Sequence, residues 1–283
     1  MAYSQGGLIQ ATDYNGFING SNQLNTVWGV GTGNAGYGQT AISAVTAAGV
    51  VTAAQWATLI NTLNSTLTHQ SGSGSGISAT TAGSKINYLS TLATNINTAY
   101  TNRLNKATTG STSTGSNFAP NPTAAGGSAY GAYVSERTVT FATGDAARYF
   151  FNAGGSINFV VSSVTNNDGT ARSTDAVAVL ALSSSGFAQA DYYALTTSYV
   201  TRKSVTGTGS YTTDSAQLNV KSSAQNASGH GDMGTTIYFG SYLNSPAHAT
   251  FNGSLNVTYN HRIDIVYPES TNLTNSWGTP TIA

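Results

Sequence analysis

Histidine is the side chain that most often binds metals or moves protons near neutral pH, and the chain has four. His69, His230, His248 and His261 show none of the paired spacings typical of zinc sites, and cysteine is absent. His230 and the neighbouring Asp232 could supply two ligands from a loop, but two ligands do not make a site. His261 alternates with polar positions on the apolar face of a strand pattern, so we expect it to be buried. The sequence predicts neither a metal nor another cofactor.

The acidic residues show no recognisable catalytic pair. Asp145, Asp191, Asp214 and Asp264 are available for acid–base chemistry, but nothing in their spacing selects two of them. The Gly-x-Ser-x-Gly turn that exposes a nucleophilic serine is also missing from the sequence. We therefore predict that the chain is not an enzyme.

A glycine-rich loop, Gly31–Gly36, matches the spacing of a dinucleotide-binding turn. That turn needs a preceding strand and a downstream acid that binds the ribose. Here the preceding residues have helical periodicity, and no carboxylate occurs between Asp13 and Glu136. We expect this segment to be a turn or a packing loop.

Tyrosine is abundant, with 16 residues. Tyr192, Tyr193 and Tyr199 lie in a stretch rich in Ser and Thr, a composition typical of adaptable binding surfaces. Because an aromatic ring can stack on a sugar, these three residues are our candidates for surface recognition, with a host surface glycan as a partner. The alternative, which we favour, is that the tyrosines pack in the core and at subunit interfaces.

The charge content excludes several classes of protein. Only 7% of the 283 residues are charged, against about 25% in an average soluble domain, and the formal net charge is zero. Ten Lys and Arg cannot form the basic patch of a nucleic-acid binder. The longest apolar run, Ala176–Leu182, is too short for a membrane span. A neutral surface does little to prevent association, so we expect a homo-oligomer in a permanent assembly.

The elements that would position these residues begin with two related helices. Ile9–Asn19 aligns without a gap with Val51–Asn61. Thr52 with Gln55 forms a capping-box pair, and Thr12 can cap the first copy. We predict a helical hairpin or a pair of docking helices. The apolar residues at helical spacing are Tyr14, Phe17, Ile18, Leu24, Trp28, Trp56, Leu59, Ile60, Leu63 and Leu67.

A third helix is predicted over 86–104. Its apolar positions step by three or four residues, close to a heptad seam: Ile86, Leu89, Ala93, Ile96, Tyr100 and Leu104. The seam is short for an independent coiled coil, so the helix could pair with sister chains or pack inside its own chain. Both interpretations remain open.

After these helices the composition and then the periodicity change. Residues 107–128 are rich in Thr, Ser, Gly and Ala and include Pro120 and Pro122, which predicts a linker. From residue 129 the period is two, most clearly over 255–267. The predicted fold is α+β: a helical region (1–106), the linker, and a mainly antiparallel β-sandwich-like domain (129–283).

Several of these motifs together resemble virion structural proteins of marine and cyanobacterial tailed bacteriophages. The resemblance lies in Ile9–Asn15, the Gly31–Gln39 loop, Val51–Trp56 with His69-Gln70, and Thr138–Gly155. It covers about the first 70 residues and a patch near 138–161. It implies a subunit of a tail, neck or fibre part located in the virion, with other virion proteins as partners and no catalytic residues.

From these observations we predict an appendage subunit that docks by its N-terminal helices and presents its β-domain for host attachment. A homotrimer is the first expectation for the assembly. The alternative is a capsid decoration or cement protein that stabilises the head lattice. The residues expected at the docking or oligomer interface are Tyr14, Phe17, Ile18, Trp28, Trp56, Leu59, Ile60, Leu63, Ile86, Leu89, Ile96 and Tyr100.

Overall fold

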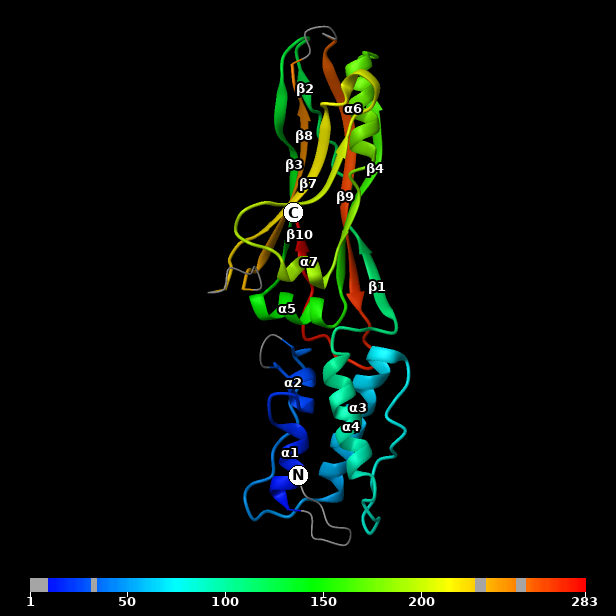
Figure 1. Ribbon diagram of the computed structural model, residues 1–283, viewed down its shortest axis with the longest axis vertical. Helices are drawn as coiled ribbons and strands as arrows, with labels where there is room; N and C mark the ends of the chain where they lie inside the picture. The colour runs from blue at the N-terminus through cyan, green and yellow to red at the C-terminus, as the bar shows by residue number, and fades with distance from the viewer. Residues whose placement is uncertain (1–9, 32–34, 227–232, 248–252) are drawn as a thin grey trace. The chain divides into compact units, whose positions relative to one another are not determined.

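The computed structural model describes residues 10–31, 35–226, 233–247 and 253–283, and the chain divides into two units (Figure 1). The first unit comprises Met1–Ser111, Arg148–Gly154 and Tyr267–Trp277. The second comprises Thr112–Ala147, Gly155–Val266 and Gly278–Ala283. Two short segments from the second half of the chain thus belong to the helical unit, which the change in periodicity along the sequence does not indicate.

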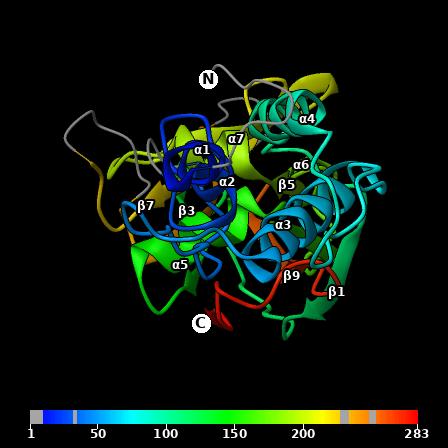
Figure 2. The ribbon, with the colours of Figure 1, turned by 90° about the horizontal axis from the view of Figure 1, so that it is seen from below.

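The first unit is built on helices. They are α1 (Ala11–Ile18), α2 (Leu24–Trp28), α3 (Ala53–Ser71) and α4 (Leu89–Thr101). Helices α1 and α2 follow one another and pack beside α3 and α4 (Figures 1 and 2). Their apolar faces meet in one core, which includes Tyr14, Phe17, Trp56, Leu63 and Leu92.

The two related helices begin with equivalent caps. The Thr52 N–H donates to Gln55 Oε1 at 2.8 Å, and the Gln55 N–H donates back to Thr52 Oγ1 at 3.3 Å, so the predicted capping box is confirmed. In the first copy the helix begins two residues earlier than predicted. Gln10, not Thr12, is the N-cap, and its N–H donates to Asp13 Oδ2 at 3.0 Å.

Side-chain amides hold the extended segments of the first unit. Asn25 donates to the Ile42 carbonyl at 2.9 Å and accepts from the Ile42 N–H at 2.8 Å. Asn15 pairs in the same way with Val45, at 2.7 and 2.9 Å. Gln39 pairs with Thr274, at 2.9 and 2.8 Å. We call these three pairs the amide clamps. Each carboxamide satisfies both backbone groups of one residue, as a neighbouring strand would, so these segments are ordered without regular secondary structure.

The second unit contains two antiparallel sheets. The first has the order β1-β9-β4-β5, with β2 also paired to β9, and the second has the order β10-β3-β8-β7-β6. The strands are β1 (Thr109–Thr114), β2 (Thr123–Ala124), β3 (Tyr130–Thr140), β4 (Ser156–Asn166), β5 (Ser185–Phe187), β6 (Val200–Thr206), β7 (Ser215–Ser222), β8 (Thr236–Ser245), β9 (Leu255–Pro268) and β10 (Thr281–Ile282). Helical segments join them: α5 (Gly144–Asn152), α6 (Ala171–Ala181), α7 (Gln189–Tyr193) and the 3₁₀ turn η1 (Gly209–Tyr211). From Arg148 onward, the residues of α5 belong to the first unit. The predicted α+β fold with a mainly antiparallel β-domain is confirmed.

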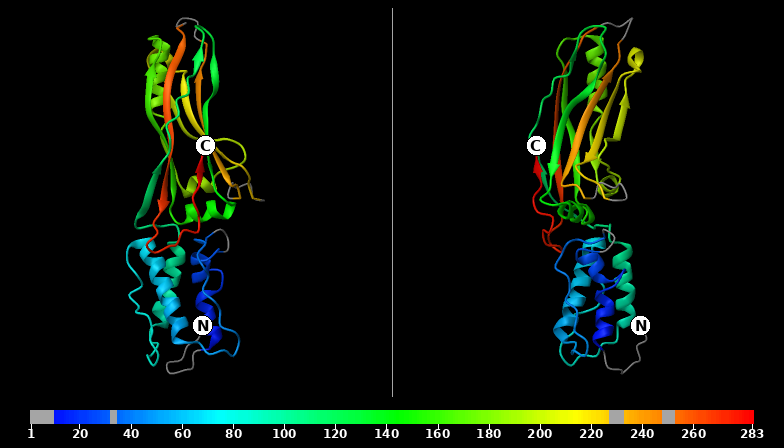
Figure 3. Two further views of the ribbon diagram at one scale, coloured as in Figure 1. Left: turned by 180° about the vertical axis from the view of Figure 1, so that it is seen from behind. Right: turned by 90° about the vertical axis from the view of Figure 1, so that its left-hand side faces the viewer.

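The two sheets pack face to face in a sandwich-like arrangement that can be followed in Figure 3. Phe187 of the first sheet meets Phe239 of the second with ring centroids 5.4 Å apart. The Tyr259 hydroxyl crosses the interface and donates to Ser241 Oγ at 3.0 Å. Alternate residues of β8 and β9 are buried, as the period of two predicts. Helix α6 packs against β4 of one sheet and β7 of the other.

One cation lies in this interior. Arg172 on α6 is fully buried, and its Nε donates to Ser245 Oγ at 2.8 Å. Its Nη2 donates to the carbonyls of Ser128 and Ser245, at 2.6 and 3.0 Å. Ser245 Oγ in turn donates to Asp214 Oδ2 at 2.9 Å, which connects the guanidinium to a buried carboxylate. Charged groups buried in this way are tolerated because they are paired and hydrogen-bonded.

The segment 107–128 is not a simple linker, which corrects the prediction from composition. Its strands β1 and β2 both pair with β9. Thr123 and Ala124 lie opposite Asn256 and Leu255, and the Phe118 N–H donates to the His261 carbonyl at 2.9 Å. The partner strand is more than a hundred residues away in the sequence, so local composition could not reveal the pairing.

Candidate functional site

The residues predicted for the docking interface lie mostly in the core of the first unit, which corrects their assignment to a surface. Tyr14, Phe17 and Trp56 pack edge to face, with ring centroids 5.6 Å apart for Tyr14–Trp56 and 6.0 Å for Phe17–Trp56. The side chains that are buried are Tyr14, Phe17, Ile18, Trp56, Leu59, Ile60, Leu63 and Ile96. Those that are half-buried are Trp28, Ile86, Leu89 and Tyr100. The two related helices bury their apolar faces against one another, so these side chains form no open docking surface.

Helix α4 also packs inside its own chain. Its buried residues are Leu92, Ile96 and Ala99, whereas Ala93 of the predicted seam is exposed and Leu104 lies beyond the helix, 44% exposed. The face that packs is therefore rotated from the predicted seam. Of the two interpretations that the sequence leaves open, the structure shows intrachain packing.

The two histidines in the described part of the chain are both buried, and each contacts a residue that is distant from it in the sequence. His69 Nδ1 lies 3.0 Å from Glu269 Oε1, and burial lowers the pKa of His69 in spite of this carboxylate. His261 Nε2 lies 3.0 Å from Ser135 Oγ, and burial, with Arg137 nearby, lowers the pKa of His261 to about 4. His261 is thus a core histidine, as predicted.

Metal and nucleotide chemistry receive no support from the described residues. Within 10–31, 35–226, 233–247 and 253–283, no three His, Asp or Glu side chains come together as metal ligands. His230 and His248 lie outside the described residues, as does part of the Gly31–Gly36 loop. The residues before that loop form α2 rather than a strand, in contrast to a dinucleotide-binding turn.

The three tyrosines that the sequence singles out lie in different environments. Tyr192 is fully buried and packs edge to face on the half-buried Tyr193, with ring centroids 5.2 Å apart. Tyr192 is therefore not a surface residue, which corrects its assignment. Tyr199 lies on the outer face of the second sheet, where it meets tyrosines that the sequence analysis did not select.

That outer face carries a cluster of tyrosines. The rings of Tyr133 and Tyr199 lie 4.7 Å apart, and Tyr133 meets Tyr242 edge-on at 5.7 Å. Gly240 on β8 leaves room for them, since a Cβ there would come within 2.6 Å of the Tyr133 ring. The packing of the Tyr133 and Tyr199 rings over β8 thus requires a residue without a side chain at position 240.

The two charged side chains beside the cluster are already in contact with tyrosines. The Tyr199 hydroxyl donates to the Glu136 carboxylate. Lys221 Nζ lies 4.5 Å from the Tyr199 ring centroid and 4.8 Å from that of Tyr238, which is within range of a cation–π interaction. Both charges therefore lie on the Tyr199 side of the cluster.

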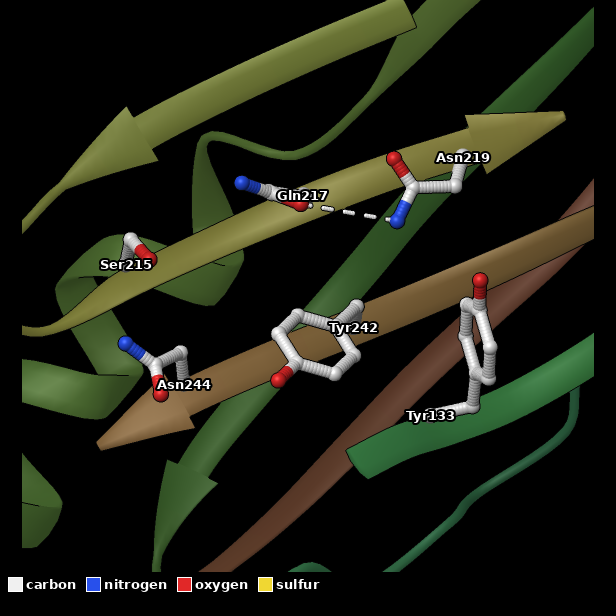
Figure 4. A pocket seen from close by; sticks show the side chains of 6 residues that line it. All are labelled: Tyr133, Ser215, Gln217, Asn219, Tyr242 and Asn244. Atoms are coloured by element: carbon white, nitrogen blue, oxygen red, sulfur yellow. Dashed lines mark hydrogen bonds between the residues drawn. The ribbon is translucent and has the colours of Figure 1, made fainter. Parts of the chain in front are cut away.

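On the Tyr242 side the sheet face is hollowed. Figure 4 shows the side chains that line this hollow, with Tyr242 in the middle. They are Tyr133 from β3, Ser215, Gln217 and Asn219 from β7, and Tyr242 and Asn244 from β8. The register brings them together, because Gln217 lies opposite Tyr242 and Ser215 opposite Asn244. We call this set of six residues the tyrosine–amide hollow.

The hollow offers hydrogen-bonding groups without charge. Its volume is about 420 Å³, within the roughly 300–1,000 Å³ range of small-molecule sites. Asn219 Nδ2 lies 3.5 Å from Gln217 Oε1, and Asn219 Oδ1 is buried without a hydrogen-bond partner. Burial raises the pKa of the Tyr133 hydroxyl, although a side-chain hydrogen bond with Asn219 lowers it. The arrangement can bind a neutral polar molecule by stacking and hydrogen bonding.

Comparisons of the chain with models of known protein families, with curated proteins and with solved structures found no match. In the part of the chain that the structure describes, no helix has the length and apolar character to cross a bilayer.

Proposed function

We propose that the chain is a non-enzymatic structural subunit of a tailed-phage particle, in a tail, neck or fibre appendage, whose β unit attaches the particle to the host surface. The tyrosine–amide hollow carries this proposal. It is a neutral, concave surface on one face of the sheet. Tyr133 at its edge is 41% exposed, so this face is accessible to a ligand. The resemblance of the N-terminal motifs to phage virion proteins supports the same role.

The location of the chain tests this function. Antibodies against the purified protein should label phage particles at the tail, neck or fibres in electron microscopy. Label spread across the capsid would instead favour the alternative, a decoration or cement protein. Particles without any label would overturn the structural role altogether.

We also propose that the subunit acts as a homo-oligomer together with other virion proteins, with a trimer as the first expectation. The support is the zero net charge and the low charged fraction of 7%, which oppose association only weakly. Helix α4 adds no support, because its apolar face is buried inside its own unit. Light scattering of the purified chain at high concentration measures the state, and a persistent monomer would contradict this part of the proposal.

A further inference from the structure

We propose that the tyrosine–amide hollow binds an uncharged sugar of a host surface polysaccharide and discriminates against acidic sugars. This inference rests on the proposed attachment function and names its ligand class. The occupant follows from two properties of the hollow: the hydrogen-bonding and aromatic groups that it offers, and the charged groups that it lacks.

The backbone of this face is not available to a ligand. Strand β8 is hydrogen-bonded to β3 on one side and β7 on the other, and β7 is hydrogen-bonded to β8 and β6. A bound peptide would need free main-chain groups at a sheet edge in order to add a strand. The ligand must therefore be recognised by side chains alone, which disfavours an extended peptide.

The side chains that remain match a sugar. Tyr242 presents an aromatic ring in the middle of the hollow, on which the C–H face of a pyranose ring can stack (Figure 4). Gln217 and Asn244 offer carboxamides beside it, and each carboxamide both donates and accepts hydrogen bonds. Sugar hydroxyls have the same dual capacity, so a row of amides satisfies them in either orientation.

The lack of charge sets the selectivity. None of the six lining residues is acidic or basic, and Glu136 and Lys221 contact Tyr199 on the other side of the cluster. A uronate, sialate or phosphate group would lose hydration on entering the hollow without gaining a cationic partner, which is costly. A neutral sugar loses only hydroxyl hydration, which the amides replace.

Asn219 lies under the hollow rather than at its open side. It is 7% exposed, its Nδ2 lies 3.5 Å from Gln217 Oε1, and its side chain is hydrogen-bonded to Tyr133. These contacts orient Gln217 and Tyr133 toward a ligand. We therefore infer that Asn219 is a positioning residue of the hollow.

The test measures binding of the full chain to two matched sets of oligosaccharides. One set contains neutral oligomers of glucose, galactose or mannose, and the other contains oligomers of equal length that carry a uronate or phosphate group. We expect at least one neutral oligomer to bind. The affinity of its acidic counterpart should be lower by a factor of about ten or more. Failure of every neutral oligomer to bind, or preference for the acidic set, would overturn the inference.

Variants identify the site. Tyr242→Ala and Gln217→Ala should weaken binding of the neutral oligomer by about two- to tenfold each, and Asn219→Ala by a similar factor. Tyr238→Ala and Gln225→Ala are the matched controls, because neither residue lines the hollow, and they should leave affinity unchanged. Gln217 lies at the surface of a paired strand, so Gln217→Ala keeps the test valid if Asn219→Ala fails to fold. Equal affinities for site and control variants would contradict the assignment.

The result of the binding test can be distinguished from the result of the labelling test of the proposed function. A chain that antibodies locate on phage particles but that binds no neutral oligomer would overturn this inference and leave the structural role standing. A chain that binds neutral oligomers through the hollow but is absent from particles would overturn the structural role and leave the sugar-binding site standing.

Discussion

The buried His261 predicts a specific loss of stability in acid. Its ring is stacked between those of Phe159 and Tyr259, with centroids 5.1 Å away in each case, and Phe118 meets it edge-on at 5.5 Å. Its Nε2 lies 3.0 Å from Ser135 Oγ, and its Nδ1 has no hydrogen-bond partner. A proton on this ring would place a positive charge among aromatic rings, close to Arg137, so the folded protein holds the imidazole neutral.

The magnitude follows from the shift of the pKa. The folded value is about 4, and the ordinary value of 6.5 applies to the unfolded chain. Above pH 6.5 neither state is protonated at this site, so the free energy of unfolding is unaffected. As the pH falls below 6.5, the unfolded chain binds the proton first, and stability is lost until the folded protein also titrates near pH 4. A difference of about 2.5 pKa units corresponds to a loss of about 3 kcal/mol, of which about 2 kcal/mol has been lost by about pH 5.

The assay compares urea unfolding of the wild type with that of the double variant His261→Phe, Ser135→Ala between about pH 7.5 and pH 4. The phenyl ring keeps the stack, and the second substitution leaves no hydroxyl without a partner. Far-UV circular dichroism follows the strands of the second unit, whereas all three tryptophans, Trp28, Trp56 and Trp277, belong to the first.

We expect the wild type to lose about 3 kcal/mol more than the variant over this range. Carboxyl groups with lowered pKa, such as Asp168 at about 2 and Glu269, also cost stability as they are protonated, but both proteins share that loss. The same pH dependence in the two proteins would show that His261 does not titrate as its surroundings indicate.

Three further substitutions test the packing. Arg172→Met should destabilise the second unit by about 3–5 kcal/mol in urea unfolding followed by circular dichroism, because Asp214 would remain buried without its cationic partner; a loss below about 1 kcal/mol would contradict this. Asn25→Ala removes one amide clamp and should lower the stability reported by tryptophan fluorescence by about 1–3 kcal/mol, whereas the exposed Asn61→Ala serves as a control that changes it little. Gly36→Ala should cost about 1–3 kcal/mol by the same readout, since its Cβ would lie 2.1 Å from the Gly29 carbonyl oxygen, and an unchanged midpoint would refute that geometry.

The elements that depend on local pattern could be predicted from the sequence. The capping pair Thr52 and Gln55 marks the start of α3, and the alternation over 255–267 marks β9. Helix α6 was missed, although Thr170 caps it, because its apolar run is short and its buried Arg172 and Asp175 interrupt the apolar face.

What could not be predicted depends on partners distant in the sequence. Spacing shows that Tyr14 and Trp56 are buried, but not whether their partner is a sister chain or the same chain. For the same reason Tyr192 looked like a recognition residue, whereas the hollow is formed by side chains from three strands. The amide and tyrosine positions on β7 and β8 lie in the region from residue 129 where the period is two, yet only the register places Gln217 opposite Tyr242.

The amide clamps have a consequence for the solution conditions that the first unit tolerates. Each clamp joins a neutral carboxamide to a neutral peptide group, as in the pairs Asn15–Val45, Asn25–Ile42 and Gln39–Thr274. Dissolved ions weaken attractions between exposed charges over about 10 Å or less at moderate ionic strength, but they have little to screen in a neutral pair. We therefore expect the amide clamps to contribute the same stability to the first unit at low and at high salt concentration.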